Sequence, residues 1–179
     1  MKTEYNIRLA RPEDIRLLPA IESAAAELYK AQISEPVLNP LVFKSVTHIH
    51  ELEDARRAGS LWVAADLNDL PVGFALVRMI DGEAYLAEMD VQPSHGRRGL
   101  GSALLVKVCD WAHETGIRAV MLSTFRDVPW NGPFYARHGF RVLERGELSP
   151  GFQDILKMER NKGLRTDLRV VMRYETKSV

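Results

Sequence analysis

The sequence has only one cysteine, and its charges balance, with 24 Lys plus Arg against 24 Asp plus Glu. One cysteine excludes an intrachain disulfide framework, and no local His spacing completes a zinc site, so no metal is expected. Cys109 lies among apolar residues of a predicted helix, which favours a buried structural thiol over a nucleophile. Balanced charge gives no overall field for nucleic acid or an anionic membrane. An anionic ligand must therefore be bound by local groups.

Long hydrophobic runs are also absent. The start, MKTEYNIRLA, has no apolar stretch of signal-peptide length, and nowhere do about 20 apolar residues follow one another to span a bilayer. We therefore expect a cytoplasmic protein without membrane contact. With 179 residues, 46% of them hydrophobic, the chain is long enough for one well-packed core, and a single domain over 1–179 is expected.

Pro and Gly punctuate the chain as turns rather than as a linker, which is typical of a compact α/β unit. Strands are predicted at 6–10, 61–66, 72–80, 84–91, 118–124, 139–143 and 168–174, and helices at 11–30, 45–59, 100–116, 131–138 and 150–162. Turns at 68–71 and at Asp81-Gly82 predict an antiparallel meander in the middle of the chain. The first helix is expected to open at Arg11-Pro12-Glu13-Asp14, because Pro and acidic residues favour a helix start.

The segment 91–105 (VQPSHGRRGLGSALL) is a strand, a glycine-rich turn and a helix start in succession. Glycines in such a turn allow positive φ angles and let a ligand approach the main chain. The first helical turn leaves N–H groups without internal partners, and these can donate to a pyrophosphate at the positive end of the helix dipole. The residues concerned are Gly96, Gly99 and Gly101, with Arg97 and Arg98 beside them as further positive charge.

The glycine-rich segment has three other possible interpretations, two of them as known nucleotide-binding loops. A P-loop needs Gly-Lys-Ser or Gly-Lys-Thr, which is absent. A dinucleotide-binding Rossmann loop needs a third glycine where Leu104 stands, and an acid about 20 residues on, where the chain has Val120, Met121 and Leu122. The remaining alternative is a tight turn with solvated arginines and no ligand.

The string PSHGRRGLGSALL resembles the acyl-CoA-binding motif of the GNAT N-acetyltransferases, which consists of Gln or Arg, any two residues, Gly, any residue, and then Gly or Ala. Gly99 and Gly101 occupy the two small positions. The first position falls on Gly96, so Arg97 or Arg98 would have to replace the side-chain contact that the family makes there.

A second string, LSTFRDVPWNGPFYARHGFRV, is similar to the family's other CoA-side motif, with Asn131, Phe134-Tyr135 and Gly139-Phe140 in the family's order. The two motifs and the element order extend the resemblance over 7–143. It implies an α/β (α+β) fold, namely a mixed, mostly antiparallel, twisted sheet of about six or seven strands with helices on both faces. Residues 145–179 would be the family-variable part.

The resemblance also implies how acetyl-CoA, the expected cosubstrate, is bound. The strand before the loop and the strand after its helix would separate, and pantetheine would enter the gap and pair with the main chain near Met89 and Val91. Pyrophosphate would lie on the main-chain amides of the loop. The expected CoA contacts are Met89, Val91, Gly96, Arg97, Arg98, Gly99, Gly101, Ser102, Asn131 and Phe134.

Acetyl transfer to an amine calls for a general base and a general acid. Glu88 stands where many GNAT enzymes carry the glutamate that accepts the amine proton, and Tyr135 resembles the tyrosine that protonates the CoA sulfur. Strand alternation places Asp90 on the face of Glu88, which makes it the rival base unless a bulge reorients it. The alternatives are solvated carboxylates and a tyrosine that packs in the core.

Acceptor contacts are expected from the first two helices, where Glu22, Glu27, Tyr29 and His48 are candidates and where the two glutamates suggest a cationic amine. The preferred function is acetylation of a small-molecule primary amine, with no nucleic-acid or membrane partner. A protein or peptide N-acetyltransferase is the runner-up, and a non-catalytic acyl-CoA sensor or interaction module is the alternative from another class. The strand at 168–174 leaves a homodimer open, because it would either pair with a second copy or complete the monomer's own sheet.

Overall fold

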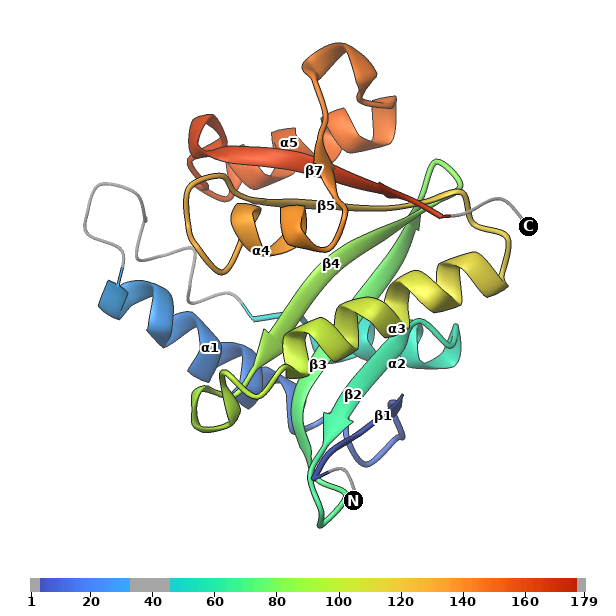
Figure 1. Ribbon diagram of the computed structural model, residues 1–179, viewed down its shortest axis with the longest axis vertical. Coiled ribbons are helices and arrows are strands. Elements are labelled where there is room, and N and C mark those ends of the chain that lie inside the picture. Colours follow the sequence, from blue (N-terminus) through green and yellow to red (C-terminus); the bar gives the residue numbers. More distant parts are fainter. Residues whose placement is uncertain (1–3, 33–45, 177–179) are drawn as a thin grey trace.

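A computed structural model describes residues 4–32 and 46–176, with the side chains of 29–32 outside that description. Its centre is one seven-stranded sheet in the order β1-β2-β3-β4-β5-β7-β6 (Figure 1). The strands are β1 (Asn6–Leu9), β2 (Leu61–Ala65), β3 (Pro71–Ile80), β4 (Glu83–Val91), β5 (Ala119–Phe125), β6 (Arg141–Val142) and β7 (Arg169–Glu175). Only β4 and β5 pair in parallel. The predicted mixed, mostly antiparallel sheet is therefore confirmed.

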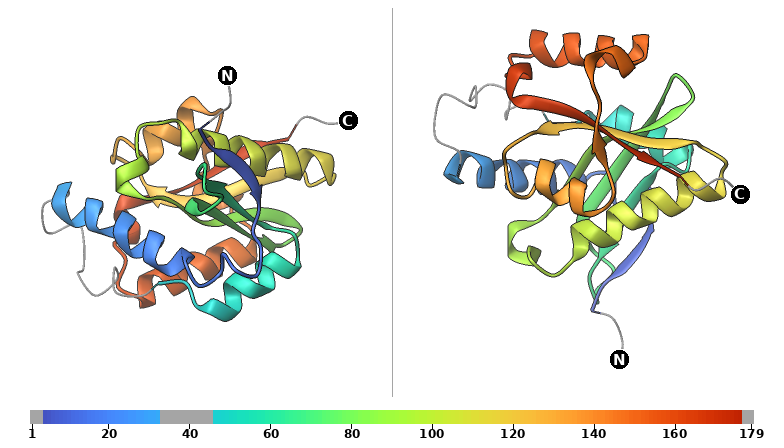
Figure 2. Two further views of the ribbon diagram at one scale, coloured as in Figure 1. Left: turned by 90° about the horizontal axis from the view of Figure 1, so that it is seen from below. Right: turned by 45° about the horizontal axis from the view of Figure 1, so that its top comes forward.

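Helices cover both faces of this sheet (Figure 2). On one face lie α3 (Leu100–Glu114) and α4 (Gly132–Arg137), and on the other lie α1 (Leu18–Gln32), α2 (Ile49–Arg57) and α5 (Pro150–Asn161). Short 3-10 turns occur at Pro93–His95, Arg145–Glu147 and Thr166–Leu168. Each face has its own core, because alternate strand residues point to opposite sides of the sheet.

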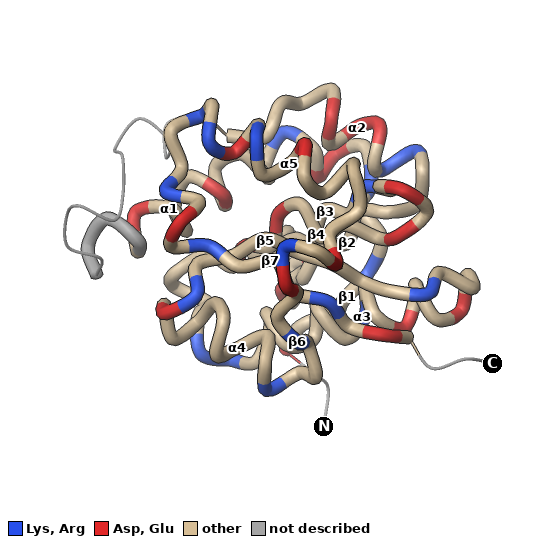
Figure 3. Tube along the Cα trace, turned by 90° about the horizontal axis from the view of Figure 1, so that it is seen from above, with Lys and Arg blue, Asp and Glu red and all other residues tan. Residues whose placement is uncertain are grey.

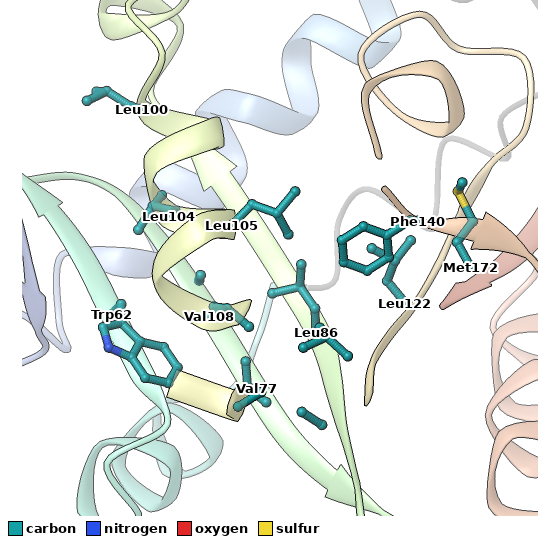
Figure 4. Packing of buried hydrophobic residues seen from close by; sticks show 14 of the residues in the cluster. Trp62, Val77, Leu86, Leu100, Leu104, Leu105, Val108, Leu122, Phe140 and Met172 are labelled. Atoms are coloured by element: carbon teal, nitrogen blue, oxygen red, sulfur yellow. The ribbon is translucent and has the colours of Figure 1, made fainter. Parts of the chain in front are cut away.

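The core under α3 is the larger one (Figure 4). Leu104 and Val108 of the helix are fully buried against the sheet, and Trp111 makes an edge contact with Trp62 of β2 at a centroid distance of 5.1 Å. This stripe is the one that helical spacing predicts. It anchors α3, and therefore the glycine-rich loop at its beginning, to the central strands.

The start of α1 differs from the sequence prediction. The helix begins at Leu18 and not at 11–14, and the residues before it form turns. The carboxylate of Asp14 is buried; it pairs with Arg8 at 2.6 Å and accepts the main-chain N–H of Arg11 at 2.7 Å. An aspartate that binds nearby main-chain N–H groups favours a turn over a helix interior. Arg8, on β1, is the distant partner that fixes this turn.

The final strand completes the sheet from within. All seven residues of β7 pair with β5, and β6 pairs with the other side of β7, so β7 is an inner strand. This strand therefore belongs to the monomer's own sheet, and on its other side β6 pairs with Met172 and Arg173.

Lys and Arg alternate with Asp and Glu along the chain, without a long segment of one sign (Figure 3). Within residues 4–32 and 46–176, no helix has the length and apolar character needed to cross a membrane.

Candidate active site

Strands β4 and β5 meet at one end and separate toward the other (Figure 1). Their parallel pairing is limited to Ala84 with Val120 and Tyr85 with Met121. Beyond Tyr85, the edge of β4 that faces β5 continues to Val91 without a paired strand among the described residues. Unpaired main-chain groups on a strand edge can bind an extended ligand as an added strand. This is the opening in which pantetheine was expected near Met89 and Val91.

A bulge in β4 decides which side chains face this opening. In the pairing with β3, Leu76 lies opposite Glu88 but Val77 lies opposite Leu86, so Ala87 is the extra residue. An extra residue reverses the alternation of the side chains that follow it. Glu88 therefore shares the α1 face with Leu76, whereas Leu86 points to the α3 core. Without the bulge, Glu88 would point into that core.

The same bulge also places Asp90. Asp90 pairs with Phe74, which belongs to the α1 face, whereas Met89 and Val91 pack toward the α3 core. Because the bulge lies before Glu88, both carboxylates remain on one face, as simple alternation predicts. The structure thus brings the predicted base and its rival together.

The loop between β4 and α3 has a different backbone from the one expected. Gly96 is extended, with φ −63°, and the left-handed residues are Arg97 at φ 60° and Gly99 at φ 80°. Of the three glycines only Gly99 uses a positive φ, so that expectation is wrong for Gly96 and for Gly101, which lies inside the helix. Gly99 is the N-cap of α3 and has no side-chain cap. The first-turn amides therefore remain available to an anion.

A cavity of about 1170 Å³ runs from this loop along β4. Every predicted catalytic or CoA-binding residue lines it except Arg98. Arg98 borders a smaller hollow of about 470 Å³ with Tyr5 and Ile7, and it forms an exposed ion pair with Glu4 at 3.6 Å. The structure therefore separates the two arginines, and only Arg97 lies beside the expected pyrophosphate position.

The opposite wall of the cavity is the short helix α4. Asn131 is its buried N-cap, and the carbonyl of Asn131 accepts the N–H of Tyr135 at 3.0 Å. Gly132 is enforced by packing, because a Cβ there would lie 2.3 Å from the carbonyl oxygen of Arg126. Tyr135 contacts Phe134 and Phe140 edge-on at 5.1 and 5.7 Å. Tyr135 thus packs on the core and also lines the cavity.

One histidine of this region has contacts that the sequence did not indicate. No role was predicted for His138, yet it links α4 to the first turn of α3. Its Nδ1 lies 2.9 Å from the carbonyl oxygen of Phe134, and its Nε2 lies 3.0 Å from the hydroxyl of Ser102. A carbonyl only accepts, so Nδ1 carries the proton and Nε2 accepts from Ser102 in neutral His138. The spacing of 36 residues hides this contact from local pattern analysis.

Three carboxylates meet at the α1 side of the cavity: Glu22 of α1, and Glu88 and Asp90 of β4. Burial, together with the charge of Glu22, raises the pKa of Glu88 to about 7, although a hydrogen bond from Asp90 lowers it. Burial and the charge of Glu88 raise the pKa of Asp90 well above its usual value. The two carboxyl groups share a side-chain hydrogen bond. Burial also raises the pKa of Glu22, whose two oxygens accept the N–H of Thr47 at 3.0 and 2.9 Å.

Tyr85 and Arg169 also line the cavity, and sequence analysis did not predict a role for either. Tyr85 is 8% exposed and contacts Phe152 edge-on. Arg169 binds Glu159 through its Nε at 3.0 Å and donates to the carbonyl of Ser123 at 2.8 Å. Arg169 comes from β7, which is distant in the sequence from β4, and no motif marks either residue.

The acceptor candidates fall into three groups. Glu22 and His48 line the cavity. Glu27 is exposed and lies outside it. The side chain of Tyr29 lies outside the described residues. Only part of the predicted acceptor set therefore faces the cavity.

Comparison with known proteins agrees with this arrangement. Residues 24–140 match the family model described as acetyltransferase (GNAT) family. The chain belongs to the GNAT acetyltransferase family. As a GNAT member it is an acyl-CoA-dependent transferase, and the matched region contains the first motif, the second motif up to Phe140, and the whole of the strand opening.

Solved structures show the same fold. The Thermoplasma acidophilum PaiA N-acetyltransferase, in complex with coenzyme A, superposes with a TM-score of 0.70 at 16% identity, over 97% of this GNAT chain and 99% of the other. The Neisseria gonorrhoeae N-acetylglutamate synthase, with coenzyme A and N-acetyl-glutamate, gives 0.70 at 19%, over 99% and 36%. Arabidopsis thaliana Naa50, with the bisubstrate analogue CoA-Ac-MVNAL, gives 0.63 at 18%, over 99% and 100%.

Proposed function

We propose that this GNAT protein transfers an acetyl group from acetyl-CoA to a primary amine of a small molecule, with Glu88 as general base and Tyr135 as general acid. The observation that carries the proposal is the bulge at Ala87, which turns Glu88 out of the core and toward the opening between β4 and β5. Residues 1–179 form the single domain that carries out this reaction.

Acetyl-CoA binds along this opening in the proposal. The first-turn amides of α3 and the Arg97 side chain hold the pyrophosphate, and the free edge of β4 at Met89 and Val91 pairs with pantetheine. Gly96, Gly99, Gly101, Ser102, Asn131 and Phe134 line the same path. Arg98 is left out of this set, because it lies beside the separate hollow.

Glu88 is suited to the role of base because its pKa of about 7 lets it take a proton near neutral pH and release it again. Asp90, whose pKa burial and the charge of Glu88 raise well above its usual value, orients the Glu88 carboxylate through their hydrogen bond. The pKa of about 7 favours Glu88 over Asp90 as the base. The two titrate as a pair, so the pH profile reports the pair.

The reaction proceeds by direct attack. Glu88 takes one proton from the substrate ammonium, directly or through water, and the neutral nitrogen attacks the thioester carbonyl carbon. The C–S bond then breaks and the Tyr135 hydroxyl gives its proton to the departing sulfur. The new amide nitrogen loses its surplus proton to solvent, and the Tyr135 oxygen regains one. The products are the N-acetyl amine and CoA.

Two other functions remain distinguishable by experiment. A peptide or protein N-terminus is the alternative acceptor, since Naa50 was solved with the bisubstrate analogue CoA-Ac-MVNAL. A non-catalytic CoA sensor would bind CoA without releasing thiol in the presence of any amine. The carboxylates around Glu88 favour an enzyme that handles a proton over such a sensor.

The Glu88→Gln variant tests the proposal. Loss of a general base should lower kcat by about 10²- to 10⁴-fold. It should also abolish the rise in kcat/KM between about pH 6 and 8 that follows from a pKa of about 7, because a base must be deprotonated to act. Acetyl-CoA affinity should be unchanged. Thiol release is the assay, and Glu27→Gln, which removes an exposed carboxylate outside the cavity, is the matched control. Full activity in Glu88→Gln would remove Glu88 from the mechanism.

A further inference from the structure

The acceptor side of the cavity has three carboxylates that no cation pairs with among the described residues. Glu22, Glu88 and Asp90 form no ion pair with any Lys or Arg that the structure describes. Each of them instead has its pKa raised by burial and by another carboxylate. Buried carboxylates without a cation are unfavourable, and a bound cation would relieve that cost.

The described cations of the cavity are already neutralised or remote. Arg78 pairs with Glu51 at 2.5 Å, and Arg169 pairs with Glu159 at 3.0 Å. The other Lys and Arg side chains that line the cavity, Arg97, Arg137 and Lys162, are exposed. Neither Arg78 nor Arg169 is thus available unpaired to an anionic acceptor, whereas a cationic acceptor finds three carboxylates.

A second observation points to a ligand in the same place. Tyr85 is 8% exposed, and its hydroxyl has no hydrogen-bond partner among the residues that the structure describes. No described polar side-chain atom is both sealed from solvent and unpartnered, so this hydroxyl opens into the cavity that Tyr85 lines. Tyr85 lies on β4, as Glu88 does, and both line the same cavity. A polar group so deeply placed is suited to accept an N–H from a bound amine.

We infer that the acceptor is a small molecule with at least two amino groups, one of which gives its proton to Glu88 while the other stays protonated and pairs with Glu22. The Tyr85 hydroxyl accepts a hydrogen bond from the same molecule. Glu22 is thus a specificity-determining residue, and a short aliphatic diamine or polyamine is the substrate class. This inference rests on the proposed acetyl transfer to an amine and adds to it the need for a second positive charge.

The decisive comparison uses 1,4-diaminobutane and 1-aminobutane, which share one carbon chain and differ in the second amino group. We expect kcat/KM for the diamine to exceed that for the monoamine by about tenfold or more, as for a partly desolvated ion pair. Glu22→Gln should bring the ratio of the two kcat/KM values close to one, mainly through a higher KM for the diamine. The glutamine oxygen can still accept the N–H of Thr47, so the contact to Thr47 survives the substitution.

Two further variants isolate the two groups. Glu27→Gln removes the same charge from the same helix outside the cavity and should keep the preference for the diamine. Tyr85→Phe should raise the KM of the amine several-fold while the KM of acetyl-CoA stays constant. Saturation of the enzyme–CoA complex with diamine should also raise the Tm of the wild type but not of Glu22→Gln.

The outcomes separate this inference from the proposed function. Equal rates with the diamine and the monoamine, or a preference for a neutral peptide with a free α-amino group, would overturn the diamine assignment and leave acetyl transfer intact. If no amine and no peptide caused thiol release, both the proposed function and this inference would be overturned. Loss of the diamine preference in Glu27→Gln as well would overturn the role of Glu22.

Discussion

The two sides of the cavity are built in different ways. The α3 side is a continuous stretch of chain in which β4, the glycine-rich loop and the first turn of α3 follow one another, and its polar groups are mainly main-chain amides. The α1 side is assembled from α1, β4, α5 and β7, and its polar groups are charged side chains. The first arrangement suits a ligand part that every family member shares, and the second suits a part that differs between them.

The two sides of the cavity differ in how they respond to substitution. Main-chain amides at a helix start are kept in every substitution except one to proline, so bulk or charge placed among them is the general way to destroy the site. A carboxylate, by contrast, is lost in a single change to its amide. Variants of the α3 side should therefore act on CoA binding, and variants of the α1 side on proton transfer and acceptor choice.

Gly101→Glu should produce the largest effect on the α3 side. A Cβ at Gly101 would lie 3.8 Å from Phe134, which is ordinary contact, and the residue lies inside α3, so the fold tolerates a side chain there. The carboxylate would then stand among the amides expected to bind pyrophosphate. We expect the stabilisation of the protein by CoA in thermal unfolding to disappear, which corresponds to at least about a hundredfold loss of affinity.

Gly146→Glu is the matched control, because Gly146 has open space around it and no positive φ. It should keep the shift in Tm that CoA causes. If Gly101→Glu kept that shift too, the loop would not be the pyrophosphate site, and the contrast between the two sides would lose its basis.

His138→Ala tests whether the α3 side depends on a side chain after all. His138 accepts from Ser102 and donates to the Phe134 carbonyl, and so holds α4 against the first turn of α3. Losing one such hydrogen bond costs about 1 kcal/mol, and we expect the KM of acetyl-CoA to rise about fivefold while the KM of the amine is unchanged.

Ser102→Ala and the double variant sharpen this test. If His138 acts through Ser102, the double variant should be no worse than either single variant. Fully additive losses would show that His138 acts by another route, and an equal rise in the KM of both substrates would indicate a general loss of structure.

The same contrast explains what the sequence could predict. The strands, the apolar stripe of α3 and the phosphate loop are local patterns, and the structure has them where the sequence places them. The predicted start of α1 was wrong because Asp14 pairs with Arg8, a side chain on another element. The extra residue Ala87 could not be predicted either, because a bulge appears only in the pairing of β4 with β3.

The acceptor side shows this limit most clearly. Glu22 and Glu27 lie on one helix and look alike in the sequence, yet only Glu22 lines the cavity. Tyr85 and Arg169 carry no motif, and Arg169 reaches the site through the sheet order, which sets β7 beside β5. Local patterns thus predict the part of the site made by neighbours in sequence, and the tertiary fold decides the rest.

Stability should show the smallest effect, and it distinguishes the two sides by pH. Glu88 and Asp90 have folded-state pKa values above their unfolded values, so folding takes up protons. The stabilisation is complete below the unfolded pKa and is lost as the pH rises through the folded pKa, which is about 7 for Glu88. The free energy of unfolding should fall by about 1–2 kcal/mol between pH 5 and 8. Urea unfolding at both pH values should show a smaller change in the free energy of unfolding for the double variant Glu88→Gln with Asp90→Asn. The change for Gly146→Glu should equal that of the wild type. If the free energy of unfolding of the double variant fell as steeply with pH as that of the wild type, the carboxylates on the α1 side would not be the groups whose pKa values folding raises.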